Sequence, residues 1–85
     1  HVDHVPLRLL TSYAGPGSEW LQEGAIGRRE LHQAMPAVDN IQRLQAGHVA
    51  VLKGEKWRGN EGAGLVHRSP SGHQRRLLLS LDWLA

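Results

Sequence analysis

VPLRLLTSY, residues 5–13, is the first apolar run of the chain, and AGPGS, residues 14–18, ends it. Branched and aliphatic side chains favour an extended strand, whereas glycine and proline favour the turn that follows. Ten glycines and four prolines divide the rest of the chain into similar short segments. This punctuation predicts a mainly β fold and argues against a helical bundle.

Further short strands are expected on the same grounds, at residues 19–21, 41–44, 48–54, 65–69 and 75–83. RRELHQAM, near residues 28–35, is the segment with helical character, and Pro36 ends it. The expected architecture is therefore a small β-sandwich or barrel with one short helix.

Length and composition narrow the function classes. The chain of 85 residues is long enough for a single β domain, residues 1–85, with a modest core. It has no cysteine, which excludes disulfides and thiolate metal sites. Its net charge of +2 comes from scattered basic residues, which argues against nucleic acid as a partner. No segment predicts a membrane span or a signal peptide, so we expect a cytoplasmic protein without membrane contact.

The residues ahead of the first strand have side chains that bind metals. In an extended chain, His1 and Asp3 point to the same face as Val5, Leu7 and Leu9, and Arg8 points to the other. The apolar set marks the inward face, so His1 and Asp3 are predicted to point inward. His67, on a later strand, is the expected third ligand. Two histidines and one carboxylate can hold a divalent metal and leave coordination positions open.

Other residues are candidates for a ligand pocket. Arg75 alternates with the leucines of RRLLLSLDW and is predicted to point inward, where it meets either an internal acid or the carboxylate of a ligand. Lys53 presents the same two alternatives, and the structural one is favoured because lysine stems lie along apolar surface. Tyr13 and Trp20 are further candidates for the pocket wall.

His4 falls on the opposite face and is predicted to be a surface residue or a partner that hydrogen-bonds a metal ligand. The remaining histidines lack ligand spacing and are predicted to be exposed or structural: His32, His48 and His73. If His1 is a processed N-terminus, its α-amino group and imidazole, together with His67, offer an alternative site for copper.

Four pieces of the chain resemble a bacterial family known as domain of unknown function 1826. They are HVDHVPLRLLTSYAGPGSEW, GHVAVLKGEKW, LVHRSP and RRLLLSLDW, and they span nearly the whole chain in order. The family has no established activity, and its genes often stand beside metal-homeostasis genes. The resemblance therefore implies a metal-related role without naming a reaction.

A looser resemblance is to the double-stranded β-helix of cupins and iron(II)/2-oxoglutarate oxygenases. It implies a partial jelly roll in which His1, Asp3 and His67 hold the metal and Arg75 holds the cosubstrate carboxylate. The implied cofactors are iron(II), or else zinc, and 2-oxoglutarate, with a small molecule as ligand. A complete barrel of this type has about eight strands. We therefore expect the chain to be the C-terminal part of a longer protein, with open strand edges that favour a homodimer.

Three functional hypotheses follow. The first is an iron(II)/2-oxoglutarate-dependent oxygenase. The second is a non-catalytic module that binds zinc through the same three residues and serves metal homeostasis. The third is a metal-free β domain that contacts a partner, in which Arg75 pairs with an internal acid.

Overall fold

The structure, a computed structural model, describes residues 1–24, 27–28, 41–72 and 74–84. The strands in these residues agree with the predicted ones to within two residues at each end. They are β1 (Leu7–Ala14), β2 (Glu19–Leu21), β3 (Gln42–Arg43), β4 (Val49–Lys53), β5 (Val66–Arg68) and β6 (Leu77–Trp83). Apart from Arg28, the helix predicted near residues 28–35 lies outside the described residues. In the described part of the chain, no helix has the length and apolar character needed to cross a membrane.

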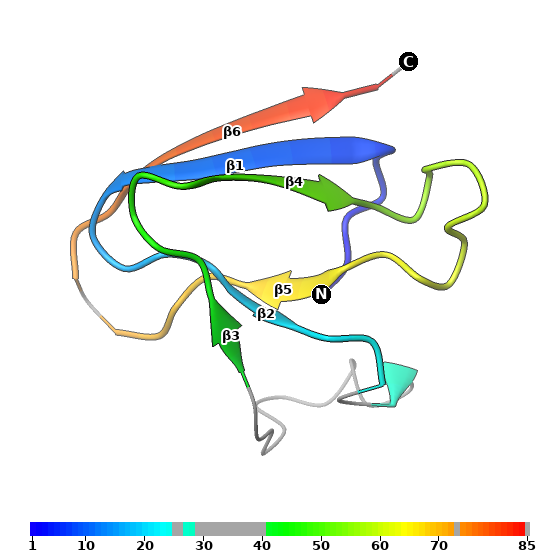
Figure 1. The fold of residues 1–85 in the computed structure, drawn as a ribbon, viewed down its shortest axis with the longest axis horizontal. Coiled ribbons are helices and arrows are strands. Elements are labelled where there is room, and N and C mark those ends of the chain that lie inside the picture. The colour runs from blue at the N-terminus through cyan, green and yellow to red at the C-terminus, as the bar shows by residue number, and fades with distance from the viewer. Residues whose placement is uncertain (25–26, 29–40, 73, 85) are drawn as a thin grey trace.

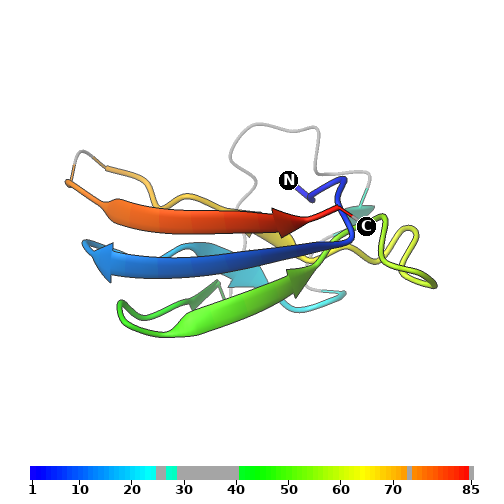
Figure 2. The ribbon, with the colours of Figure 1, turned by 90° about the horizontal axis from the view of Figure 1, so that it is seen from above.

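The described strands form two antiparallel sheets of three strands each, with the orders β4-β1-β6 and β3-β2-β5. The sheet β4-β1-β6 has the longer strands and is called the larger sheet, and β3-β2-β5 is called the smaller sheet. In Figure 1 the larger sheet lies above the smaller one, and the N-terminus lies beside β5. Figure 2 looks down on the larger sheet and shows β1 between β4 and β6. The prediction of a mainly β fold is confirmed, with two small sheets as its layers.

The inner face of the larger sheet is marked by Leu10 and Leu52, which are 4% and 3% exposed. Arg8 lies directly opposite Leu52 and two residues before Leu10, so it points to this inner face. The prediction that Arg8 points outward was therefore wrong. The reason is that the face with Leu7 and Leu9 was taken as the inward one, whereas Leu10, on the face of Arg8, is the buried leucine of β1. Residues 4–6 also form a bend, so the strand's alternation does not extend back to the N-terminus.

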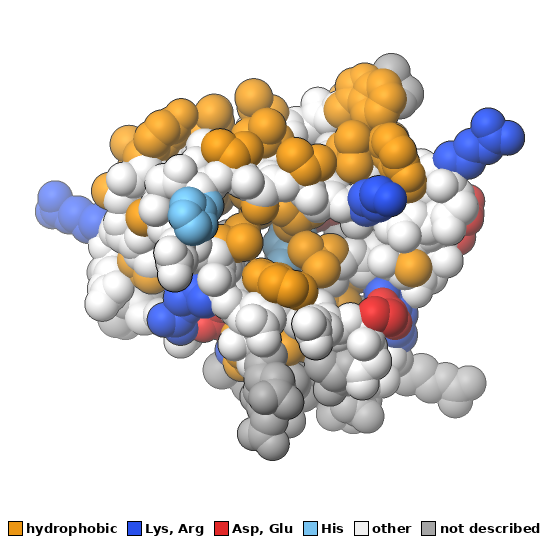
Figure 3. All heavy atoms as spheres, in the orientation of Figure 1, with side chains coloured by type: hydrophobic (Ala, Val, Ile, Leu, Met, Phe, Trp, Pro, Cys, Tyr) orange, Lys and Arg blue, Asp and Glu red, His pale blue; other side chains and the backbone are white. Residues whose placement is uncertain are grey.

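The outer face of the larger sheet is apolar and exposed. Its side chains that are more than half exposed include Val49, Val51, Leu77, Leu81 and Trp83. Hydrophobic side chains gather along the upper rim of the molecule in Figure 3, over this sheet.

The apolar face of the last strand was predicted to point inward, and this was wrong. Arg75, predicted to be inward with that face, is exposed. The more apolar face of the strand was taken as the inward one. This criterion failed because the inner face of the sheet holds charged side chains that form ion pairs. Arg8 is the example, since its guanidinium binds Asp82 of β6.

The smaller sheet is held together by two ion pairs that share Glu19 and join all three strands. Glu19 of β2 is buried, and its two carboxylate oxygens accept hydrogen bonds from Arg43 of β3 at 2.6 Å and from Arg68 near the end of β5 at 2.8 Å. These bonds, that to Arg43 first, lower the pKa of Glu19 below its ordinary value of 4.5. The carboxylate is therefore charged throughout the physiological pH range.

Gly54, just after β4, allows the N-terminal segment to come close to this strand. Its amide donates to the carbonyl of Pro6 at 3.0 Å, and the amide of Glu55 donates to the carbonyl of Asp3 at 2.8 Å. A Cβ atom on Gly54 would lie 2.1 Å from the carbonyl oxygen of Val5 and 2.8 Å from that of Asp3. Because no larger residue fits there, Gly54 determines where Asp3 sits.

Candidate metal centre

His1, Asp3 and His67 come together at the end of β5. One ligand atom from each residue lies within 4.8 Å of the other two. His67 belongs to β5 and is 64 positions from Asp3 in the sequence. These are the three residues that the sequence analysis selected as metal ligands, so the fold assembles the predicted set.

Direct contacts join the three residues. The Nε2 atom of His67 lies 2.9 Å from Oδ2 of Asp3, and both side chains are buried. The Nε2 atom of His1 lies 3.7 Å from Oδ1 of Asp3, and the His1 side chain is 60% exposed. The two imidazole rings are 4.4 Å apart between centroids. The site therefore has two buried members and one that reaches solvent.

Backbone hydrogen bonds fix His1 beside β5. The amide of His67 donates to the carbonyl of His1 at 3.0 Å, and the N-terminal amino group of His1 donates to the carbonyl of His67 at 3.1 Å. In this arrangement the amino group is bound to a backbone oxygen, whereas the copper hypothesis needs it as a metal ligand.

Arg8 extends the cluster toward β6. Its Nη1 atom donates to Oδ1 of Asp3 at 2.5 Å, while Nε and Nη2 donate to the two carboxylate oxygens of Asp82 at 2.6 and 2.9 Å. The hydrogen bond with Asp82 raises the pKa of Arg8, and the same bond lowers the pKa of Asp82. Asp3 is thus held on one oxygen by a guanidinium and presents the other to His67.

The distances are compatible with a metal ion. Imidazole nitrogen and carboxylate oxygen bind zinc at about 2.0–2.2 Å in a tetrahedral arrangement, which puts neighbouring ligand atoms about 3.3–3.6 Å apart. The 2.9 Å between His67 Nε2 and Asp3 Oδ2 is a hydrogen-bond distance, so the two atoms would move apart by a few tenths of an ångström to hold zinc. His1 is exposed enough to turn its ring toward the same point. Within the described residues every buried side-chain nitrogen and oxygen has a hydrogen-bond partner, so the cluster also satisfies its own polar groups without an ion.

Arg75 and Tyr13 do not join the cluster. Arg75 is exposed and lies against Gly15, just beyond the far end of β1. Since β1 has eight residues, this end is about 23 Å from the one near Asp3, at roughly 3.3 Å per residue. Tyr13, near the same far end, is 62% exposed. The role predicted for Arg75 at the metal is therefore not supported by its position.

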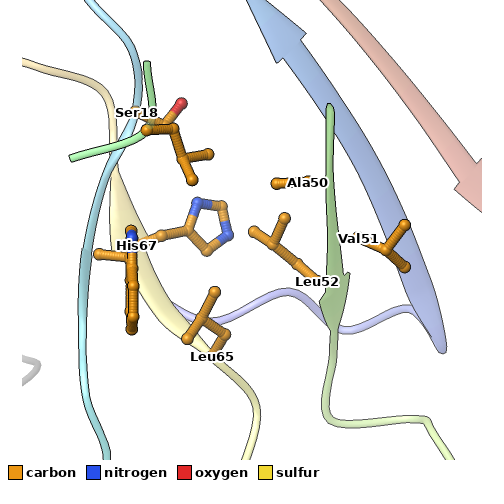
Figure 4. A pocket seen from close by; sticks show the side chains of 8 residues that line it. Ser18, Ala50, Val51, Leu52, Leu65 and His67 are labelled. Atoms are coloured by element: carbon orange, nitrogen blue, oxygen red, sulfur yellow. The ribbon is translucent and has the colours of Figure 1, made fainter. Parts of the chain in front are cut away.

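Lys53 and Trp20 have different surroundings. Lys53 is exposed, and its ammonium lies 5.6 Å from the centre of the Trp57 ring, which agrees with the structural alternative. Trp20 lies opposite His67 in the β2–β5 pair. Trp20 and His67 line a cavity of about 250 Å³ between the sheets, which Figure 4 shows. Trp20 thus lies at the wall of a cavity, and its role in binding a ligand stays a prediction.

The other histidines lie away from the cluster or outside the described residues. His4 and His48 are exposed, in agreement with the prediction for both. His32 and His73 are not among the described residues.

Arg8 and Asp82 were not predicted from the sequence to have a role at the site. Each is the charged residue that interrupts an apolar strand segment, in LRLL and in LSLDW. Opposite charges that interrupt two apolar strands are a signal for an ion pair between them. That signal required knowing that β1 and β6 are neighbours, which alternation within one strand does not reveal.

The chain was compared with known proteins. The family model described as protein of unknown function (DUF1826) matches residues 1–82. No curated protein and no solved structure matched. The matched range includes all three residues of the cluster and both members of the Arg8–Asp82 pair. The chain therefore belongs to the DUF1826 family of proteins of unknown function.

Proposed function

We propose that His1, Asp3 and His67 bind one divalent metal ion and that the chain is a metal-binding domain. The observation that carries the proposal is the convergence of these three ligand types from two segments that are far apart in the sequence. A lone histidine or a lone His–Asp pair is common in proteins. Two histidines and a carboxylate around one point form a ligand set for divalent metals.

The partners of the cluster favour the same function. In metal sites, a ligating carboxylate is commonly hydrogen-bonded by a further residue that orients it. Arg8 binds Oδ1 of Asp3 and leaves Oδ2 beside His67. His1 lies on the exposed side of the cluster, so positions on that side of an ion are open to water or a small ligand.

Zinc and iron(II) both suit this ligand set. The oxygenase hypothesis also needs a cation that binds the far carboxylate of 2-oxoglutarate. Arg75 is exposed beyond the far end of β1, and the guanidinium near the cluster, that of Arg8, already binds Asp3 and Asp82. We therefore propose a metal-binding module. Its resemblance to the cupins rests only on the three residues of the proposed ligand set.

The test measures metal content after dialysis against zinc, and against iron(II) without oxygen, on wild type, His67→Ala and Asp3→Asn. His48→Ala is the matched control because it removes an exposed imidazole outside the cluster. We expect one bound metal per chain in wild type and in the control, and none in the two cluster variants. Bound metal should also raise thermal stability, because an ion that binds the folded state alone stabilises it.

Absence of metal in wild type, or the same content in His67→Ala as in His48→Ala, would overturn the proposal. Asp3→Asn keeps the shape of the side chain but removes its charge from the pair with Arg8, so thermal unfolding of each variant without metal is measured to separate loss of a ligand from loss of the fold. Turnover of 2-oxoglutarate is measured on the iron(II) samples, and a positive result would restore the oxygenase hypothesis.

A further inference from the structure

The cavity between the two sheets is lined almost entirely by apolar side chains. Trp20, Leu44, Leu52 and Leu65 supply most of its wall, and the polar side chains there are Ser18 and His67. Its volume is about 250 Å³. In Figure 3 the surface is hollowed between the two layers, with hydrophobic side chains around the hollow. The cavity is therefore both apolar and open to solvent.

Size and polarity define what fits there. An apolar cavity of about 150 Å³ accepts benzene, so this larger one has room for a substituted ring or a short branched chain. None of its described lining residues is Asp, Glu, Lys or Arg. A charged ligand would lose its hydration there without gaining a partner, which is strongly unfavourable. The fit is thus to a neutral, mainly apolar molecule.

The polar groups of the wall have different roles. The hydroxyl of Ser18 accepts a hydrogen bond from Arg76 at 3.2 Å, and Arg76 also donates to the carbonyl of Pro16 at 2.7 Å. The Ser18 hydroxyl on the cavity wall is therefore already engaged by Arg76. The Nε2 atom of His67 lies against Asp3, and the Nδ1 atom, on the other side of the ring, does not take part in that contact. In Figure 4 the imidazole projects into the space among Ser18, Ala50, Leu52 and Leu65.

His67 consequently belongs to two sites at once. Its Nε2 atom belongs to the cluster with Asp3, and its ring forms part of the cavity wall. A molecule in the cavity would contact the same ring that binds the metal. We propose that this cavity binds a small neutral apolar molecule and holds it against the metal-binding His67. The position beside a metal rests on the proposed function, whereas binding in the cavity does not.

The cavity does not suit 2-oxoglutarate. That cosubstrate carries two carboxylates, and the described wall offers neither of them a cation. The ligand predicted here is instead uncharged, of the size of toluene or somewhat larger. Its apolar part would fill the space among the leucines, and the His67 ring would be its polar neighbour.

The experiment titrates toluene into the metal-free and the zinc-loaded chain and follows the NMR signals of Leu52, Leu65 and the His67 ring. Benzoate, which has the same ring but a negative charge, is the matched ligand. We expect saturable shifts and intermolecular contacts with toluene, and binding at least about tenfold weaker for benzoate. In the zinc-loaded chain, the His67 ring signals should shift with toluene.

Ala50→Leu tests the location, because Ala50 lines the cavity and a larger side chain would fill it. Ala14→Leu adds the same volume at an exposed site at the end of β1. Toluene affinity should fall about tenfold or more in the first variant and stay unchanged in the second. The contacts seen in wild type test the placement even if Ala50→Leu fails to fold.

The outcomes distinguish the two proposals. Bound zinc without toluene contacts in the cavity would overturn this inference and leave the metal site. Toluene in the cavity of a chain that takes up neither zinc nor iron(II) would overturn the metal site and leave the apolar ligand. Benzoate binding as tightly as toluene, or equal loss in Ala14→Leu, would also overturn the inference.

Discussion

Replacing Gly54 by alanine should weaken metal binding at the proposed site without changing any of the three proposed ligand side chains. The new Cβ would lie 2.1 Å from the carbonyl oxygen of Val5, whereas such contacts essentially never fall below 3.0 Å. The N-terminal segment must therefore withdraw by about 0.9 Å or more. Metal ligands tolerate displacements of roughly 0.2 Å from their usual distances, so this shift is enough to separate Asp3 from His67.

The cost of the Gly54→Ala substitution follows from the bonds at stake. The withdrawal disturbs two backbone hydrogen bonds, from Gly54 to Pro6 and from Glu55 to Asp3. At about 1 kcal/mol each, we expect a loss of about 2 kcal/mol in the free energy of unfolding. Urea unfolding measures this loss, and zinc titration of the folded variant should show affinity at least about tenfold lower.

Gly47→Ala is the matched control. Gly47 has a φ of 87° and no atom within 4 Å of an added Cβ, so alanine there is strained without displacing a neighbour. It should cost roughly 1–2 kcal/mol of stability and leave zinc affinity unchanged. If Gly54→Ala binds zinc as wild type does, or if both variants lose affinity equally, the argument that Gly54 positions Asp3 is refuted.

Three further predictions concern the core and the ion pairs. Arg8→Met should destabilise the fold, because it leaves the buried carboxylate of Asp3 without its cation, and thermal unfolding should show a lower midpoint than in wild type. Glu19→Gln should flatten the pH dependence of stability below pH 4.5. The lowered pKa of Glu19 supplies stability above that pH, and wild type loses it as the carboxylate protonates, which urea titrations at several pH values would detect. Leu10→Ala should cost about 2–5 kcal/mol by urea unfolding, whereas Val49→Ala, at a side chain 63% exposed, should cost under about 1 kcal/mol; equal losses would contradict the assignment of the inner face.

The strands were predictable because glycine and proline mark their ends. AGPGS separates β1 from β2, and PSG precedes β6, so even short strands could be bounded from the sequence. The face that each strand buries was less accessible. In β1 both faces carry leucines, and the choice fell on the face with Leu7 and Leu9, whereas Leu10 on the other face is the one that is buried.

The candidate site illustrates the same limit. His1, Asp3 and His67 were selected as ligands and lie together, but the supporting argument of continuous alternation was wrong, since residues 4–6 bend. The bend brings Asp3 to the side of Arg8. Arg75 was selected as the cation of the site because it shares a face with leucines in its own strand. Which arginine reaches Asp3 depends on contacts between strands, and these are not encoded in the alternation of one strand.

The cluster also has a consequence for the order in which the molecule forms. The pairs Asp3–His67 and Arg8–Asp82 join residues 64 and 74 positions apart. Closing a loop of that length costs about 4 kcal/mol of chain entropy, and contacts this distant slow folding. The unfolded chain offers an ion no more than neighbouring residues such as His1 and Asp3. The complete ligand set exists only after nearly the whole chain has closed, so cobalt(II) added to refolding protein should develop its bound spectrum at the folding rate and no faster.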